Sequence, residues 1–84
     1  MEEYLITFRS VTHAQRGQRL LEKAGIRAVL RRTPRWMEEK GCGYSLRLSG
    51  GEIIRAEELL RQNIVPVRKV YVQKKDGTME EMPL

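Results

Sequence analysis

Short apolar stretches separated by polar turns run along this chain, and four of them have the length and composition of β-strands. The clearest covers residues 44–49, Tyr-Ser-Leu-Arg-Leu-Ser, in which every second residue is apolar. A period of two places apolar side chains on one face of a sheet and polar side chains on the other. The other expected strands are Tyr4–Phe8, Ile26–Arg32 and Arg68–Lys74.

Two longer stretches repeat apolar residues every three or four positions, which is the spacing of one face of an α-helix. The first begins after an N-cap at Ser10 or Thr12 and ends at Gly25. Its apolar face consists of Ala14, Gly17, Leu21 and Ala24. The second helix is expected at Glu52–Asn63, and its core-facing residues are Ile53, Ala56, Leu59 and Leu60. A glycine on the first apolar face indicates close packing against the sheet.

The order strand, helix, strand, strand, helix, strand predicts an α+β fold of the ferredoxin-like βαββαβ type. In this fold two helices cover one face of a four-stranded antiparallel sheet. The chain has 84 residues, which is the size of one domain, and we expect that domain to span residues 1–75. Residues 76–84 start with an Asp-Gly turn signal and continue either as a loose tail or as a short hairpin arm.

The expected topology places the connection between the second and third strands at the same end of the sheet as the start of the first helix. This connection contains the only cysteine, Cys42, between Gly41 and Gly43. Unpaired N–H groups and partial positive charge at a helix N-terminus favour a thiolate, and glycines let backbone N–H groups turn toward an anion. The candidate residues around the thiol are Ser10, Thr12, His13 and Arg35. The alternatives are a buried cysteine without a role and a histidine that is only a polar helix-start residue.

Charge and cysteine content narrow the functional classes. The net charge is +5 and arginine outnumbers lysine by 11 to 5, so the surface either attracts an anionic partner or is simply a solvated basic surface. A single cysteine forms no internal disulfide, in agreement with a reducing compartment. No apolar run reaches the roughly 18–20 residues that span a bilayer, and the acidic start lacks signal-peptide features. We expect a cytoplasmic protein without a membrane partner.

Turnover chemistry has little support in the sequence. One cysteine and one histidine fall short of the ligands that zinc needs, and we expect neither a metal nor a cofactor. No phosphate-binding loop, catalytic triad or acid/base pair of carboxylates is recognisable. Whether the protein is an enzyme stays open, and a carrier is favoured over an enzyme that works alone.

Several motifs resemble those of the selenium/sulfur carrier-like family of small bacterial proteins. They are Phe8-x-Ser10-x-Thr12-x-Ala14, Leu20-Leu21, Gly25-Ile26, Pro34-Arg35 and Cys42-Gly43-x-x-Leu46-Arg47. The resemblance covers most of residues 4–72. It implies that Cys42 carries sulfur or selenium as a persulfide or perselenide. It also implies donor and acceptor proteins as partners.

Two other functions are compatible with the same fold. An RNA- or polyanion-binding module would use the strand arginines, which are Arg27, Arg31, Arg32, Arg47 and Arg68. Residues 44–49 lack the paired stacking aromatics of RNA-binding domains, so a nucleic-acid partner is the weaker alternative. A dimeric regulatory module would pair an exposed sheet edge with a second copy. The carrier function is therefore the leading hypothesis, with these two as alternatives.

Overall fold

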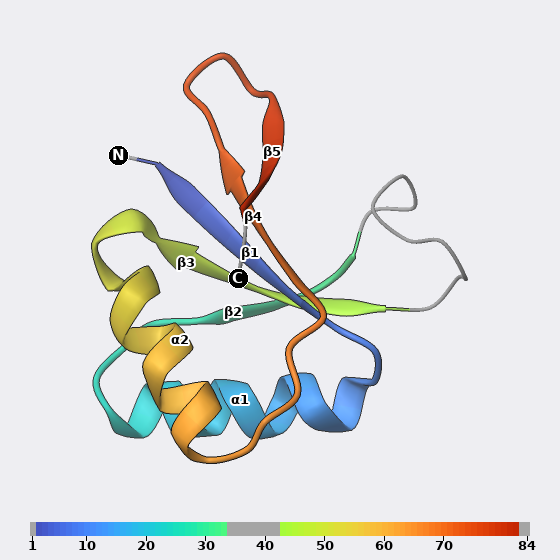
Figure 1. Cartoon of the computed structure of the whole chain (residues 1–84), viewed down its shortest axis with the longest axis vertical. Coiled ribbons are helices and arrows are strands. Elements are labelled where there is room, and N and C mark those ends of the chain that lie inside the picture. The colour runs from blue at the N-terminus through green and yellow to red at the C-terminus, as the bar shows by residue number, and fades with distance from the viewer. Residues whose placement is uncertain (1, 34–42, 83–84) are drawn as a thin grey trace.

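The computed structural model describes residues 2–33 and 43–82 of the chain (Figure 1). Five strands, two α-helices and one short 3₁₀ turn make up this part of the protein. In chain order they are β1 (Glu3–Phe8), α1 (Val11–Lys23), β2 (Val29–Arg32), β3 (Tyr44–Ser49), η2 (Gly50–Glu52), α2 (Ile53–Gln62), β4 (Lys69–Gln73) and β5 (Met79–Met82).

The strands form one antiparallel sheet in the order β2-β3-β1-β4-β5, and both helices lie on the same face of it (Figure 1). The predicted α+β class and the placement of the helices are confirmed. The prediction of a four-stranded ferredoxin-like sheet is wrong in its strand count, because residues 79–82 add a fifth strand beside β4.

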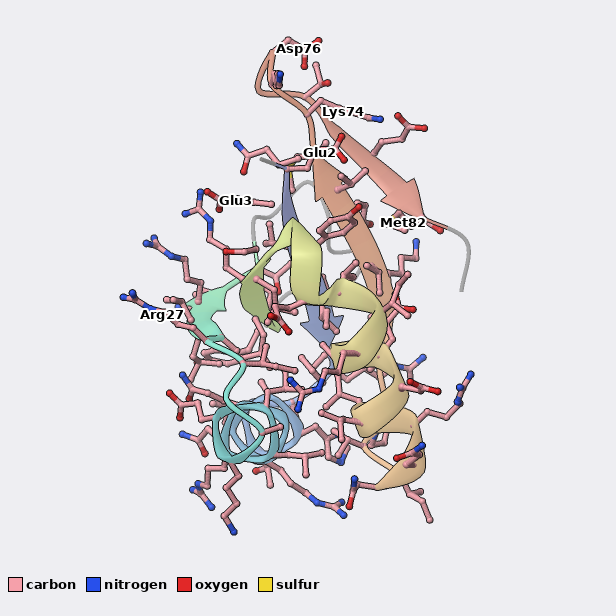
Figure 2. All side chains as sticks on the ribbon, turned by 90° about the vertical axis from the view of Figure 1, so that its left-hand side faces the viewer. Glu2, Glu3, Arg27, Lys74, Asp76 and Met82 are labelled. Atoms are coloured by element: carbon pink, nitrogen blue, oxygen red, sulfur yellow. The ribbon has the colours of Figure 1, made fainter. Side chains whose placement is uncertain are left out.

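A tight turn creates the fifth strand. Gly77 has φ +88°, and the Lys74 N–H donates to the Thr78 carbonyl at 2.8 Å, so the chain reverses onto β4. Asp76 lies at the tip of this hairpin (Figure 2). Its Oδ1 accepts hydrogen bonds from the Thr78 N–H at 3.0 Å and from the Thr78 hydroxyl at 2.6 Å. The Asp-Gly turn was predicted, and these bonds fix the register of the strand that follows it.

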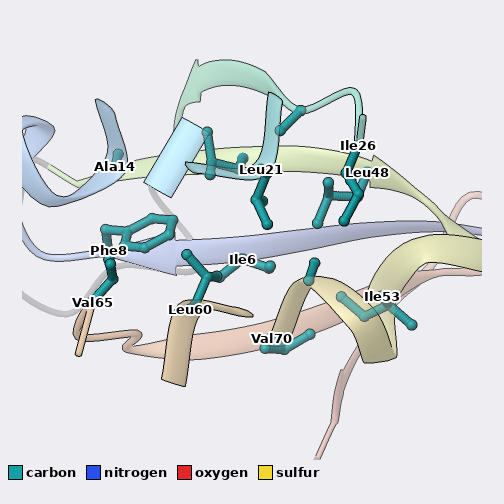
Figure 3. Packing of buried hydrophobic residues seen from close by; sticks show 13 residues of the cluster. Ile6, Phe8, Ala14, Leu21, Ile26, Leu48, Ile53, Leu60, Val65 and Val70 are labelled. Atoms are coloured by element: carbon teal, nitrogen blue, oxygen red, sulfur yellow. The ribbon is translucent and has the colours of Figure 1, made fainter. Parts of the chain in front are cut away.

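The main hydrophobic core lies between the helices and the sheet (Figure 3). Phe8, Leu21 and Leu60, from β1, α1 and α2, are fully buried in it. Gly17 lies where the two helices and the sheet meet, and a Cβ there would be only 3.1 Å from Leu60 Cδ2. The apolar face predicted for the first helix is therefore confirmed, and glycine at position 17 permits the close approach.

The second strand is shorter than predicted. The pattern indicated Ile26–Arg32, whereas β2 begins only at Val29. Ile26 and Ala28 are buried, but the Ala28 carbonyl accepts a hydrogen bond from Gln18 Nε2 of α1 at 2.9 Å. The backbone before Val29 is thus bonded to the helix instead of to a neighbouring strand.

The two helices end with the same hydrogen-bond pattern but with different residues at the turn. After α1, Gly25 has φ +82° and the Ile26 N–H donates to the Leu21 carbonyl at 2.9 Å. After α2, the corresponding residue is Ile64 with φ +55°, and its side chain is 81% exposed. A β-branched residue in this left-handed conformation is strained, by roughly 1–3 kcal/mol. The end of α2 is therefore a strained point on the surface.

Neither α1 nor α2 covers the second face of the sheet, which we call the uncovered face. Its residues include Leu5, Thr7, Ser45, Arg47 and Tyr71. Leu5 and Tyr71 are paired across β1 and β4 and are 8% and 7% exposed. Met79 of β5 packs against them as a partly buried neighbour. The fifth strand therefore widens a small second apolar cluster on this face.

Candidate functional site

The two ends of the connection between β2 and β3 are held together by the backbone. Arg32 pairs with Tyr44, and the Thr33 N–H donates to the Gly43 carbonyl at 3.0 Å. Thr33 and Gly43 are both buried. Three residues of the predicted thiol site, Arg35, Gly41 and Cys42, fall outside the described ranges, so the predictions about them stay predictions.

The start of α1 lies at the same end of the sheet as Gly43. Phe8, the last residue of β1, pairs with Tyr44, the first residue of β3, and α1 begins three residues later at Val11. This confirms the predicted placement of the helix start beside the end of the β2–β3 connection (Figure 1). We call this the Gly43 end of the sheet and the opposite end the Glu3 end.

Ser10 is the N-cap of α1. It has extended backbone angles, and its Oγ accepts a hydrogen bond from the His13 N–H at 3.2 Å. Of the two residues predicted for this role, Ser10 is confirmed and Thr12 is not the cap. The Ser10 hydroxyl oxygen is therefore engaged with the helix backbone, as expected for a capping serine.

The first turn of α1 keeps its positive electrostatic character. It contains no acidic residue. The N–H groups of Val11 and Thr12 have no hydrogen-bond partner in the part of the chain that the structure describes. Thr12 is exposed and His13 is half-buried. Unpaired N–H groups at a helix start attract anions, so the Gly43 end offers donors to a negatively charged group.

Thr33 is a residue of this end that the sequence did not single out. It is 7% exposed, and its Oγ1 is the only fully buried side-chain oxygen or nitrogen without a partner within residues 2–33 and 43–82. Such an unsatisfied hydroxyl costs about 1–3 kcal/mol. No sequence signal distinguishes it from other strand-end threonines, because the absence of a partner depends on the packing.

The Glu3 end of the sheet is electrostatically different, because two of its cations have carboxylate partners. Arg47 Nε donates to Glu3 Oε2. Lys74 Nζ lies 3.8 Å from Glu2 Oε2 and 3.7 Å from Glu80 Oε2. At the hairpin tip, hydrogen bonds from Thr78 lower the pKa of Asp76. Arg47 and Lys74 are therefore balanced by carboxylates, whereas Arg27 and Lys75 have no ion-pair partner within residues 2–33 and 43–82.

Neither α1 nor α2 is long and apolar enough to cross a bilayer, and no other helix is described. Within residues 2–33 and 43–82, no three His, Cys, Asp or Glu side chains gather closely enough to hold a metal ion.

Comparison with protein-family models gives a match over most of the chain. Residues 3–72 match the model described as "Putative Se/S carrier protein-like". The matched range runs from the first residue of β1 almost to the end of β4 and includes the whole β2–β3 connection. Comparisons with curated proteins and with solved structures found no match.

Proposed function

Because the chain belongs to the Se/S carrier protein-like family over residues 3–72, we propose that it carries sulfur or selenium on the thiol of Cys42. The family match is the observation that carries this proposal. Cys42 is the only cysteine in the chain and therefore the only thiol that can hold such a cargo. The residue after it, Gly43, lies at the end of the sheet where α1 begins.

Loading is a transfer between two sulfur atoms. The Cys42 thiolate attacks the outer sulfur of a donor protein's persulfide, a new S–S bond forms at Cys42, and the donor leaves as its own thiolate. The charge balances, because one thiolate is consumed and one is released. With selenium, the same attack falls on the terminal selenium of a donor perselenide.

Release requires a partner protein. Because the chain has no second cysteine, no internal disulfide can displace the cargo. An acceptor's thiolate instead attacks the terminal atom of the loaded Cys42, and the Cys42 thiolate leaves. The protein thus acts as a carrier between a donor and an acceptor.

In this proposal, described residues of the Gly43 end stabilise the Cys42 thiolate and the persulfide anion. The Val11 and Thr12 N–H groups and the Thr33 hydroxyl are donors without partners in the described part. In this proposal they lower the free energy of the thiolate before loading and of the persulfide anion after it. Ser10 holds the helix start in place through its capping bond.

Intact mass spectrometry tests the proposal. The protein is incubated with a small-molecule persulfide donor, the excess donor is removed, and the mass is measured with and without a reductant. We expect one added sulfur atom on the wild type, which the reductant removes, and none on Cys42→Ser. An unmodified wild type, or an equal adduct on Cys42→Ser, would contradict the carrier function.

The two alternatives have weaker support among the described residues. Tyr4 and Tyr44 pack on the helix side of the sheet, and Tyr71 on the uncovered face is buried, so none of them offers an exposed ring for stacking RNA bases. Edge pairing between two copies would bring like charges together, because β2 ends in two arginines and β5 contains two glutamates. Light scattering checks the second point, and we expect a monomer.

A further inference from the structure

A cationic hollow lies on the uncovered face at the β2 edge of the sheet. Its volume is about 310 Å³. Figure 2 shows Glu3 and Arg27 on the same side of the molecule, and both belong to its lining. The described residues that line it are Glu3, Arg27, Val29, Arg31, Arg47, Leu48 and Ser49.

Strand geometry brings three arginines of this hollow around one apolar side chain. Val29 and Arg31 lie two residues apart in β2, so they project to the same face of the sheet, and Arg27 lines the hollow from the segment before the strand. Val29 pairs with Arg47 of β3, which places these two side chains directly opposite each other. Arg27 and Arg31 therefore flank Val29 along the chain, and Arg47 lies beside it on the neighbouring strand.

The charges in the hollow are not balanced. Arg47 donates to Glu3, the only carboxylate among the described residues of the lining. Arg27 and Arg31 are exposed, and neither has an ion-pair partner within residues 2–33 and 43–82. Two guanidinium groups thus face the hollow without a counter-charge from the described residues.

From this arrangement we propose that the hollow binds the phosphate group of a small molecule. The planar guanidinium group of arginine matches a phosphate with two parallel hydrogen bonds, and Arg27 and Arg31 are available for such bonds from two sides. The volume is at the lower end of the range for ligand sites, so it has room for a phosphate and a small organic group. Val29 supplies an apolar wall for that group.

The phosphate site is separate from the proposed cargo site. The hollow includes Ser49, the last residue of β3, whereas Gly43 precedes the first residue of that strand. Six strand residues correspond to about 17–20 Å. The hollow extends back to Arg31, which pairs with Ser45, so the part with Arg27 and Ser49 is the part that lies apart from Gly43.

NMR titration of the full chain with inorganic phosphate tests the proposal, with sodium chloride at equal ionic strength as the reference. We expect phosphate-specific shifts of the amides of Val29, Arg31 and Arg47. In Arg31→Gln we expect binding roughly tenfold or more weaker, because a charge-assisted hydrogen-bond pair is lost. Arg55→Gln removes an equal charge from the exposed surface of α2 and should leave the affinity unchanged.

A second titration distinguishes the sources of the phosphate group. Glycerol phosphate should bind more tightly than inorganic phosphate if the ligand is a small phosphate ester, and equally if the ligand is the free ion; both results support the site. Shifts centred elsewhere, such as at Arg16 and Arg19 of α1, or equal weakening by Arg55→Gln, would overturn it. Arg27→Gln should also weaken phosphate binding, and persulfide loading measured on it should be unchanged, which separates this proposal from the carrier function.

Discussion

The two ends of the sheet differ in which of their polar and charged groups have hydrogen-bond or ion-pair partners. At the Glu3 end, Lys74 and Arg47 lie beside carboxylates, and Asp76 accepts two hydrogen bonds. At the Gly43 end, the first N–H groups of α1 and the Thr33 hydroxyl have no partner in the described part of the chain. Unsatisfied donors in a small domain cost stability. In the proposed function, the donors at the Gly43 end support an anion on Cys42, which is present while the thiol is deprotonated or loaded.

The largest expected effect on stability comes from the turns that follow the two helices, which lie at opposite ends of the sheet. The Ile64 turn lies at the Gly43 end and the Gly25 turn at the Glu3 end, and both have positive φ. Ile64→Gly should raise the free energy of unfolding by roughly 1 kcal/mol, because glycine adopts this conformation without strain. Gly25→Ile should lower it by roughly 1–3 kcal/mol. Urea denaturation checks both values. Equal effects of the same sign would contradict the assignment of strain to one end.

Thr33→Val separates stability from function at the Gly43 end. Valine has almost the same shape but no hydroxyl, so the protein should gain about 1 kcal/mol or more in the free energy of unfolding. Persulfide loading of Cys42 should become slower, because one donor to the anion is lost. Thr7→Val is the matched control, since the Thr7 hydroxyl is hydrogen-bonded to Lys69 and its loss should destabilise the protein. If Thr33→Val loads as fast as the wild type, Thr33 does not take part in the site.

Thr12→Glu places a negative charge in the first turn of α1. The helix should become more stable by about 0.3–1 kcal/mol, because a carboxylate interacts favourably with a helix N-terminus. Loading of Cys42 should be slower, since the same positive potential then has a resident anion. Gln73→Glu makes the same charge change at the Glu3 end of the sheet and should not slow loading. Equal rates in both variants would mean that the start of α1 does not act on the thiol.

Asp76 should give the smallest effect, confined to the β4–β5 hairpin. The Thr78 hydrogen bonds lower the pKa of Asp76 in the folded protein, so its contribution to stability is present above the ordinary carboxyl pKa. This contribution is lost as the pH falls through the lowered folded pKa. Hydrogen exchange should therefore show faster opening of the Lys74 and Thr78 amides in acid, with the Phe8 amide unaffected. Asp76→Ala should show this faster opening at neutral pH as well.

The periodic pattern of apolar side chains predicted the helices and strands that bury one face. Elements without such a pattern could not be predicted in this way. The alternation in β3 and the helical spacing of Ala14, Gly17 and Leu21 reflect burial directly, so both were predicted correctly. Residues 79–82, Met-Glu-Glu-Met, show no alternation. This strand is held by backbone pairing with β4 after a tight turn, and its sequence left a loose tail equally open.

For the candidate site, topology could be predicted but individual contacts could not. Gly43 and the start of α1 lie at the same end of the sheet, and this follows from the antiparallel strand order alone. The capping role of Ser10 was one of two options that only the backbone angles resolve. Thr33 was not predicted at all, because an unpartnered hydroxyl depends on every neighbour around it. The arginine hollow likewise depends on the register between β2 and β3.

A pH titration of the Cys42 thiol tests the central claim most directly, which is that the Gly43 end stabilises an anion on Cys42. Thiolate formation is followed by ultraviolet absorbance in the wild type, in Thr33→Val and in Thr12→Glu, with Cys42→Ser as the blank. We expect a midpoint clearly below about 8.5, the usual value for a free cysteine, and a higher midpoint in both variants. A wild-type midpoint at or above that value, unmoved by either substitution, would contradict the account.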